Sequence, residues 1–400
     1  MPAPAPSSDP RRPSDRFATI TTLGAGLSAL ALLTVPTAVT PMAGAQVAPP
    51  ICEATAYIVG AADNEVARYD IPTRTPDGSP LALPAGSFPD SIVVTPDGAT
   101  AFVGLLALGQ VATIDTASNT ITGTIDVGNN PNDLSITPDG ATLYVPNGAD
   151  GTVSTIDVAT RTKDPVDLVV GAGPQAVAFT PDGTTAFVSN SGDDSVSVID
   201  VATRTVDPTA IAVGNAPSGL AVSPDGADLY VPIQDGNPLP DPGKTGVVTV
   251  IDVATRTVDP APITGFQHPL QVLFTGDGVA FVVNGGNTVS TIDVATRTTN
   301  PVDLVVGQFP VQAALTPDGT EVWVANLDEA TVSVIDVDTR TVDATAIPVT
   351  RGPSALAFGP CASVPPTTTT TTAAPTTPTT RAPAPAPAAA PVTATPRLAG

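Results

Sequence analysis

Short runs of β-branched and aromatic residues alternate with turn-forming residues through the middle of the chain. In the stretch that begins at Pro174, the runs QAVAF, TAFVSN, SVSVID and AIAVG are separated by TPDG, SGDD and VATRT. Gly, Pro, Asn and Asp favour turns, whereas Val, Ile, Thr and Phe favour strands. This pattern predicts a unit of four short antiparallel β-strands.

The unit repeats along the chain, and a proline enters the first run of each copy. Pro131, Pro174 and Pro217 are spaced by 43 residues. The full set of these prolines is Pro89, Pro131, Pro174, Pro217, Pro269, Pro310 and Pro353. A four-stranded unit of about 40–45 residues that recurs in this way predicts an all-β, seven-bladed β-propeller of four-stranded antiparallel blades. A linear solenoid is the alternative.

The two ends of the array favour a closed ring. The first copy, ICEATAYIVG (Ile51 to Gly60), begins at a turn and lacks its first strand. The last copy, PSALAF (Pro353 to Phe358), is a first strand with no second strand after it. We therefore expect the C-terminal strand to pair with the N-terminal blade. Such closure removes the open sheet edges that a solenoid keeps.

The strand and turn motifs resemble a known repeat. PDGATLYVPN (Pro138 to Asn147), PDGTTAFVSN, and EVWVAN followed by TVSVIDV are similar to the YVTN-type β-propeller repeat of bacterial and archaeal secreted and surface proteins. The resemblance covers residues 51–361. It implies the propeller fold and says little about activity, because propellers carry many unrelated functions.

The only two cysteines occupy the same position of the repeat, in the blade that the first and last copies form together. Cys361 stands where other copies have the Asp of a Pro-Asp-Gly turn, and Cys52 aligns with that Asp at the start of the first copy. Paired antiparallel strands bring Cα atoms to about 4.5–5.5 Å, within disulfide range. We predict a Cys52–Cys361 disulfide that replaces the missing turn. Two free buried thiols are the alternative.

The chain ends differ in composition from the repeats. Arg11, Arg12 and Arg16 precede an Ala/Leu-rich run over residues 17–39, and AGA at residues 43–45 is typical of a signal peptidase site. The predicted organisation is a signal peptide over residues 1–45, a propeller over 46–363, and a disordered Pro/Thr/Ala-rich tail over 364–400. The general export route fits better than the twin-arginine route. We expect a secreted protein, free or associated with the cell envelope, in a compartment where disulfides form.

The net negative charge of the chain limits the kinds of molecule that it is expected to bind. The chain has 15 basic and 38 acidic residues and a net charge of -23. A surface of this sign repels phosphate backbones, so a nucleic acid is not expected as a partner. Beyond the signal peptide, no apolar stretch is long enough for a membrane span. We expect a monomer that binds an as yet unknown protein or glycan.

Motifs that recur in nearly every copy are expected to serve the fold. In PDG, the Pro presets φ, the Asp caps its own turn, and the Gly adopts positive φ. In IDVATRT, the Asp accepts backbone N–H groups, and we expect the Arg to pair with an acid of the neighbouring blade.

The sequence contains no recognised catalytic or phosphate-binding motif. One histidine and two cysteines cannot form a multi-histidine or four-thiolate metal site, so we predict no metal, cofactor or catalytic residue. NGADG (Asn147 to Gly151) and SGDD (Ser191 to Asp194) offer oxygen ligands to Ca²⁺ but lack the spacing of a calcium loop, which favours plain turns.

Departures from the repeat indicate where a ligand would bind. IQDGNPLPDPGKTG (Ile233 to Gly246) lengthens the loop between strands two and three of the fifth blade. In a propeller this loop shares one face with the segments that precede each first strand, where function-carrying loops gather. The candidate residues of this ligand face are Phe88, Asn129, Asn130, Lys244, Phe266, His268, Phe309 and Arg351.

Three functions are consistent with these features. The favoured one is a non-enzymatic binding or interaction module. The second is a propeller-borne enzyme, of the lactonase or streptogramin-lyase type and metal-dependent in some cases, although such sites generally use clustered His, acidic residues or a metal and this chain has one His. The third is a structural protein of the cell envelope.

Overall fold

The computed structural model describes residues 54–234, 245–349 and 351–361. The chain divides into two compact units, residues 1–49 and 50–400, and all described residues belong to the second. The predicted signal peptide, the tail over 364–400, and Cys52 lie outside the described residues.

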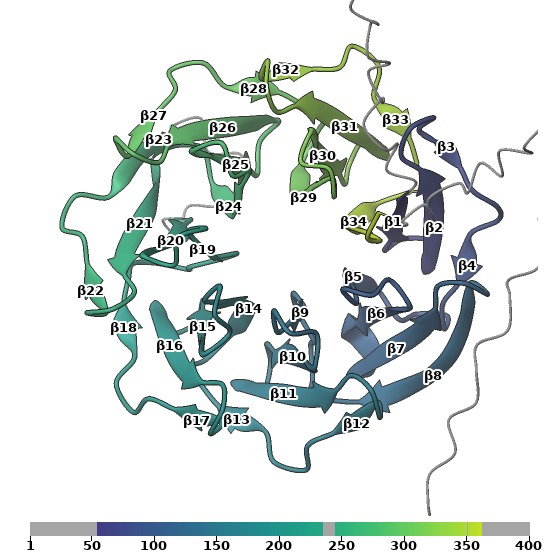
Figure 1. The fold of residues 1–400 in the computed structure, drawn as a ribbon, viewed down its shortest axis with the longest axis horizontal. Helices are drawn as coiled ribbons and strands as arrows, with labels where there is room; N and C mark the ends of the chain where they lie inside the picture. The colour runs from purple at the N-terminus through teal and green to yellow at the C-terminus, as the bar shows by residue number, and fades with distance from the viewer. Residues whose placement is uncertain (1–53, 235–244, 350, 362–400) are drawn as a thin grey trace, which may run out of the picture. The chain divides into compact units, whose positions relative to one another are not determined.

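Seven antiparallel sheets form a ring, as predicted (Figure 1). Blade 1 combines the chain ends and contains β34 (Pro353–Phe358), β1 (Thr55–Gly60), β2 (Glu65–Asp70), β3 (Thr75–Pro76) and β4 (Leu81–Ala82). Blade 2 contains β5 (Pro89–Val94), β6 (Thr100–Leu105), β7 (Gln110–Asp115) and β8 (Thr120–Asp126), with a single 3₁₀ turn at Leu106–Leu108.

The next three blades follow in chain order. Blade 3 contains β9 (Ser135–Ile136), β10 (Thr142–Asn147), β11 (Thr152–Asp157), β12 (Thr162–Lys163) and β13 (Leu168–Val169). Blade 4 contains β14 (Pro174–Phe179), β15 (Thr185–Asn190), β16 (Ser195–Asp200), β17 (Thr205–Val206) and β18 (Ile211–Ala212). Blade 5 contains β19 (Ala221–Val222), β20 (Asp228–Ile233), β21 (Gly246–Asp252), β22 (Thr257–Val258) and β23 (Ile263–Phe266).

The last two blades complete the ring. Blade 6 contains β24 (Pro269–Phe274), β25 (Val279–Asn284), β26 (Thr288–Asp293), β27 (Thr298–Thr299) and β28 (Leu304–Val305). Blade 7 contains β29 (Pro310–Leu315), β30 (Glu321–Asn326), β31 (Thr331–Asp336), β32 (Thr341–Val342) and β33 (Ile347–Pro348).

The ring closes in blade 1 as the sequence predicts. The C-terminal strand β34 pairs antiparallel with β1, with Ala56 opposite Phe358 and Ile58 opposite Leu356. Beyond the strand, Gly359 N donates a 2.9 Å hydrogen bond to Thr55 O. This bond places Gly359, two positions before Cys361 in the sequence, beside Thr55, three positions after Cys52. The disulfide itself stays a prediction, because Cys52 is not described.

The outer strand differs from the prediction in most blades. In blade 4 the expected strand AIAVG is preceded by β17, and the two short strands β17 and β18 both pair with β16. Asp207 and Pro208 separate them: Pro cannot donate to the ladder, and Asp207 Oδ1 accepts a hydrogen bond from Thr209 N. Blade 2 lacks this Asp-Pro pair, and its outer strand β8 is continuous.

The core lies between adjacent blades. The second and third strands are almost fully buried, as in β15, and their side chains pack against those of the next blade. Trp323, Tyr144 and Tyr230 are among the largest buried side chains. Each of these rings meets a Phe edge-to-face, with centroids 5.1–5.4 Å apart, and the partners are Phe358, Phe179 and Phe274. Stacking of blade on blade therefore supplies the hydrophobic stabilisation.

The Pro-Asp-Gly turns have the expected structure. Asp139 Oδ1 accepts hydrogen bonds from Thr137 Oγ1 at 2.6 Å and from Ala141 N at 3.0 Å, and Gly140 adopts φ +74°. A Cβ on Gly140 would lie 3.1 Å from the Pro96 ring of the preceding blade. Pro360, which precedes Cys361, contacts Gly98 in the same way. Pro360 thus takes the place of a turn proline although the chain is cut there.

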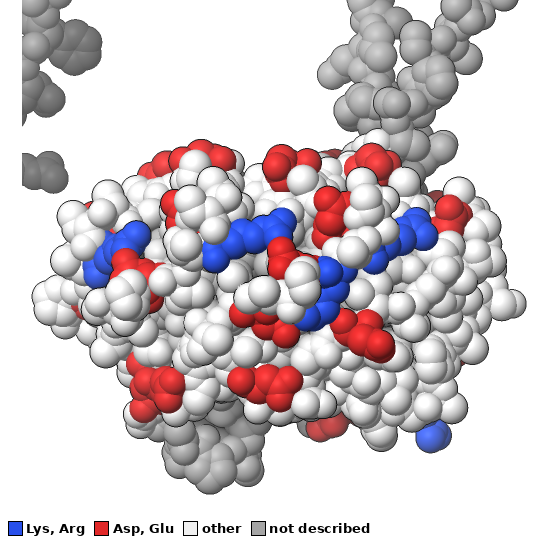
Figure 2. All heavy atoms as spheres, turned by 90° about the horizontal axis from the view of Figure 1, so that it is seen from below, with Lys and Arg blue, Asp and Glu red and all other residues white. Residues whose placement is uncertain are grey.

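The arginines of the outer turns join neighbouring blades, as expected. Arg204 pairs with Asp164, Arg256 with Asp207, and Arg297 with Asp259 at 2.5 Å. Arg161 instead donates to Thr122 Oγ1 at 2.8 Å. Figure 2 shows the resulting row of basic side chains beside acidic ones along the rim.

Candidate functional site

The central channel is lined by the start of the first strand of each blade. The residue that follows the strand-one proline lines one cavity of about 260 Å³ in every blade. These seven residues are Asp90, Asn132, Gln175, Ser218, Leu270, Val311 and Ser354. Asp133, Gln271 and Gln312, one position further along, line the same cavity.

A backbone irregularity directs these side chains. In blade 2 the register of the ladder shifts between Pro89 and Ser91, and blades 4, 6 and 7 show the same shift after Pro174, Pro269 and Pro310. A β-bulge rotates the following residue out of the regular alternation. The proline that marks each repeat therefore also marks the place where side chains turn toward the channel.

Polar groups of the channel wall connect one blade to the next. Ser354 Oγ donates to Pro89 O at 2.9 Å, and Asn132 Nδ2 donates to Pro174 O at 2.8 Å. The Oε1 atom of Gln271 accepts a 2.7 Å hydrogen bond from Ala313 N. These bonds hold the carboxamides in fixed orientations, as a preformed binding site requires.

One contact crosses the channel. Gln312 Oε1 accepts a 2.7 Å hydrogen bond from Leu356 N, and its Nε2 is 3.4 Å from Asp133 Oδ1. Asp133 belongs to blade 3 and Gln312 to blade 7, and Figure 1 shows β9 and β29 across the ring from each other. Asp133, Gln271 and Gln312 also line a second cavity of about 580 Å³, which extends toward the Pro-Asp-Gly turns and is walled by apolar residues such as Ile92 and Leu134. The three residues therefore mark the boundary between a polar and an apolar part of the channel.

The two carboxylates of the channel have raised pKa values. Burial raises the pKa of Asp90. Burial and the negative charge of Asp90 raise the pKa of Asp133 to about 7. Asp90 is exposed and Asp133 is half-buried, and both line the channel cavity, whose walls crowd the two carboxylates. Asp133 is consequently close to half-ionised at neutral pH.

The residues predicted to form the ligand face do not gather in one site. Phe309 is half-buried and lines the channel cavity. Phe88 and Arg351 lie together in a separate pocket. Asn129 is exposed, and Asp150 accepts hydrogen bonds from its N and Nδ2 atoms. Asn130 is exposed as well, with φ +57°.

Three candidates behave differently. His268 is half-buried with φ +52°, and its carbonyl accepts a 2.9 Å hydrogen bond from Gly285 N. Phe266 is 0% exposed and packs in the core with Tyr230 and Val272, so it is not a surface residue of this face. Its position in β23, opposite Gly246, directs the ring inward. Lys244 lies outside the described residues.

Sequence reasoning missed most of the channel wall. The signal was present one residue after each strand-one proline, where Asp90, Asn132 and Gln175 interrupt otherwise apolar runs. Among the described residues, no three His, Cys, Asp or Glu side chains are placed to hold a metal ion. The same part of the chain contains no helix long and apolar enough to cross a membrane.

No family model and no curated protein matches this chain. Solved structures do match. Hydrazine synthase from Kuenenia stuttgartiensis is 22% identical with a TM-score of 0.60, over 68% of this chain and 90% of that one. A putative 6-phosphogluconolactonase from Bacteroides fragilis is 17% identical with a TM-score of 0.62, over 78% and 99%.

A third structure has no known function. The protein from Desulfotomaculum acetoxidans is 13% identical with a TM-score of 0.64, over 76% of this chain and 99% of that one. At these identities the likeness extends to the fold alone. The chain is thus similar in fold to several propeller proteins whose functions differ.

Proposed function

We propose that the protein is an exported, non-enzymatic β-propeller of the YVTN-type repeat family that binds a glycan at the mouth of its central channel. One observation carries the proposal. Each blade places the residue after its strand-one proline on one cavity, and most of these side chains are carboxylates, carboxamides or hydroxyls.

The chemistry of this wall fits a sugar. Sugar hydroxyls both donate and accept hydrogen bonds, and carboxylates, carboxamides and serine hydroxyls together offer both functions. Phe309 adds an apolar surface for the C–H face of a sugar ring. A cavity of about 260 Å³ is just below the range of drug-sized pockets, which suits one terminal sugar unit better than a protein loop.

Export is supported by the chain ends. The basic and apolar segment that precedes AGA is typical of a signal peptide, and the Pro/Thr-rich tail is typical of a stalk. Glycans are abundant ligands outside the cell, so localisation and ligand class agree.

A glycan array tests the proposed function. Fluorescently labelled full-length protein is applied at neutral pH, with heat-unfolded protein as the control. We expect a discrete group of glycans with a shared terminal sugar to retain the folded protein, and mass spectrometry to recover those glycans unchanged. Binding no stronger than that of the unfolded protein would refute the proposal.

The raised pKa of Asp133 makes an enzyme the second candidate function. A carboxyl group with a pKa of about 7 is suited to general acid–base catalysis, and Asp90 is a second carboxylate in the same cavity. Hydrolysis of 6-phosphogluconolactone, assayed with and without added divalent cations, tests this candidate. Turnover that is lost in Asp133→Asn would establish an enzyme in place of a binding module.

A further inference from the structure

A second pocket lies on the same face, where the ring closes. Its volume is about 520 Å³, and its walls come from blades 1 and 7 and from the segment that leads into blade 2. Phe88, Leu327, Asp328, Ala62, Arg351 and Gly352 are among its lining residues. None of them lines the channel cavity, so the two sites are distinct.

The floor of this pocket is apolar and closely packed. A Cβ on Gly352 would lie 3.4 Å from Ala62 Cβ and 3.6 Å from Leu327 Cδ1. Gly352 adopts φ +61°, and its carbonyl accepts a 2.9 Å hydrogen bond from Ala61 N. The closure of the ring thus fixes the floor.

An exposed aromatic ring stands at the edge of the pocket. Phe88 is 58% exposed, and its backbone is held at φ +44°, where a bulky residue is strained. Its N–H donates a 3.0 Å hydrogen bond to Asn64 Oδ1, which helps to hold this conformation. The equivalent residues of other blades, such as Asn130, His268 and Phe309, also have positive φ, so this conformation belongs to the repeat, and the exposed ring is what distinguishes Phe88.

The pocket also contains one positive and one negative side chain that are not paired. Among the described residues, Arg351 and Asp328 form no ion pair, either with each other or with other side chains. Most arginines of the rim, by contrast, are paired with acids. Arg351 is anchored through its backbone, since its N–H donates to Asp63 Oδ2 at 3.1 Å. Its guanidinium is available for a carboxylate.

We propose that this pocket binds a free α-amino acid with a large apolar side chain. The carboxylate of the ligand pairs with Arg351 in the bidentate manner that guanidinium groups favour. The ammonium group pairs with Asp328, and the apolar side chain packs against Phe88 and Leu327. The proposal does not depend on glycan binding in the channel, because the two pockets share no lining residue.

Isothermal titration of the full-length protein with L-phenylalanine tests this site. N-acetyl-L-phenylalanine lacks the ammonium group, and L-phenylalaninamide lacks the carboxylate. We expect each to bind at least about tenfold more weakly than L-phenylalanine, since each loses one charged pair. The same affinity for all three compounds, or no binding of L-phenylalanine, would overturn the proposal.

Variants locate the site. Arg351→Gln is expected to weaken binding of L-phenylalanine and to leave the affinity for L-phenylalaninamide unchanged. Arg161→Gln, at a rim arginine that also lacks an ion pair among the described residues, is the matched control and should bind as the wild type does. An equal loss in both variants would refute the assignment to this pocket. Tighter binding of the dipeptide Phe-Phe than of L-phenylalanine would overturn a free amino acid as the ligand.

Discussion

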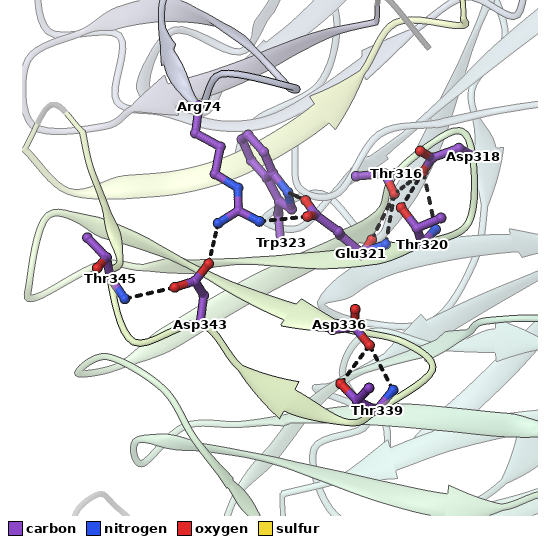
Figure 3. Close-up of polar contacts among 10 residues, drawn as sticks. All are labelled: Arg74, Thr316, Asp318, Thr320, Glu321, Trp323, Asp336, Thr339, Asp343 and Thr345. Carbon is purple, nitrogen blue, oxygen red and sulfur yellow. Dashed lines mark hydrogen bonds and ion pairs between the residues drawn. The ribbon is translucent and has the colours of Figure 1, made fainter. Parts of the chain in front are cut away.

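The guanidinium group of Arg74 lies 2.6 Å from Glu321 Oε1, although the two residues are 247 positions apart. Arg74 belongs to the outer turn of blade 1, and Glu321 begins β30 of blade 7. Figure 3 shows that Arg74 also contacts Asp343 and that Trp323 Nε1 donates a 2.8 Å hydrogen bond to Glu321 Oε2. This network ties the first blade to the last on the outer side of the ring.

Removal of Arg74 should loosen this closure. Arg74→Gln is expected to lower the free energy of unfolding by about 1 kcal/mol, because a half-buried ion-pair network is disrupted. Arg340→Gln is the control, since the 3.5 Å contact of Arg340 with Asp277 is longer and its side chain is more exposed. Urea unfolding measures both variants. Equal effects would contradict a special role of the blade 1–blade 7 junction.

The turn at Pro360 should hold blade 1 against blade 2, on the other side of the closing blade. Gly98 and Gly319 have nearly the same φ, +73° and +74°, so Ala strains both backbones equally. A Cβ on Gly98 would lie 2.7 Å from Pro360 Cδ, whereas nothing lies within 4 Å of a Cβ on Gly319. We therefore expect Gly98→Ala to cost about 1 kcal/mol more than Gly319→Ala in urea unfolding. Identical losses would show that Pro360 does not pack against Gly98.

The predicted Cys52–Cys361 disulfide would complete the closure. Peptide mapping without reduction, on protein from the exporting host, should recover the two cysteines in one linked peptide. Because the enclosed loop is long, the chain-entropy model allows a stabilisation of at most about 5–6 kcal/mol. Reduction should therefore lower the midpoint of thermal unfolding. Two free thiols in the exported protein would rule the disulfide out.

Asp133 should make stability depend on pH. The pKa of Asp133 in the folded protein lies above its usual value, so the folded state binds this proton more tightly than the unfolded chain does. Its contribution to stability is therefore present at about pH 4 and is lost as the pH rises through about 7.

The Asp133→Asn variant isolates this effect. It should match the wild type at pH 4 and exceed it at pH 8 by at most about 4 kcal/mol, because the pKa of Asp133 is raised to about 7 in the folded protein. Asp338→Asn, which makes the same replacement at an exposed outer turn, is the control. A constant difference between Asp133→Asn and the wild type from pH 4 to 8 would contradict the raised pKa.

The repeat made the fold predictable, because strands and turns recur at nearly fixed spacing. The absence of a first strand from the first copy alone predicted how the ring closes. The paired arginines followed from the same regularity. The channel wall did not, since each blade contributes a different residue after its proline. The contact of Gln312 with Asp133 joins blades 7 and 3, and no pattern of neighbouring residues in the sequence predicts it. Phe266 is buried in the core and pairs with Gly246, at the end of an insertion whose path the sequence leaves open.

The position of the ligand in the channel is the central claim, and Asp90 tests it most directly. Asp90→Asn preserves shape but removes a carboxylate acceptor from the cavity, whereas Asp338→Asn makes the same change at the rim. Isothermal titration with the glycan that binds best on the array should show at least about tenfold weaker affinity for Asp90→Asn and wild-type affinity for Asp338→Asn. Wild-type affinity in the Asp90→Asn variant would contradict a glycan site at the channel mouth.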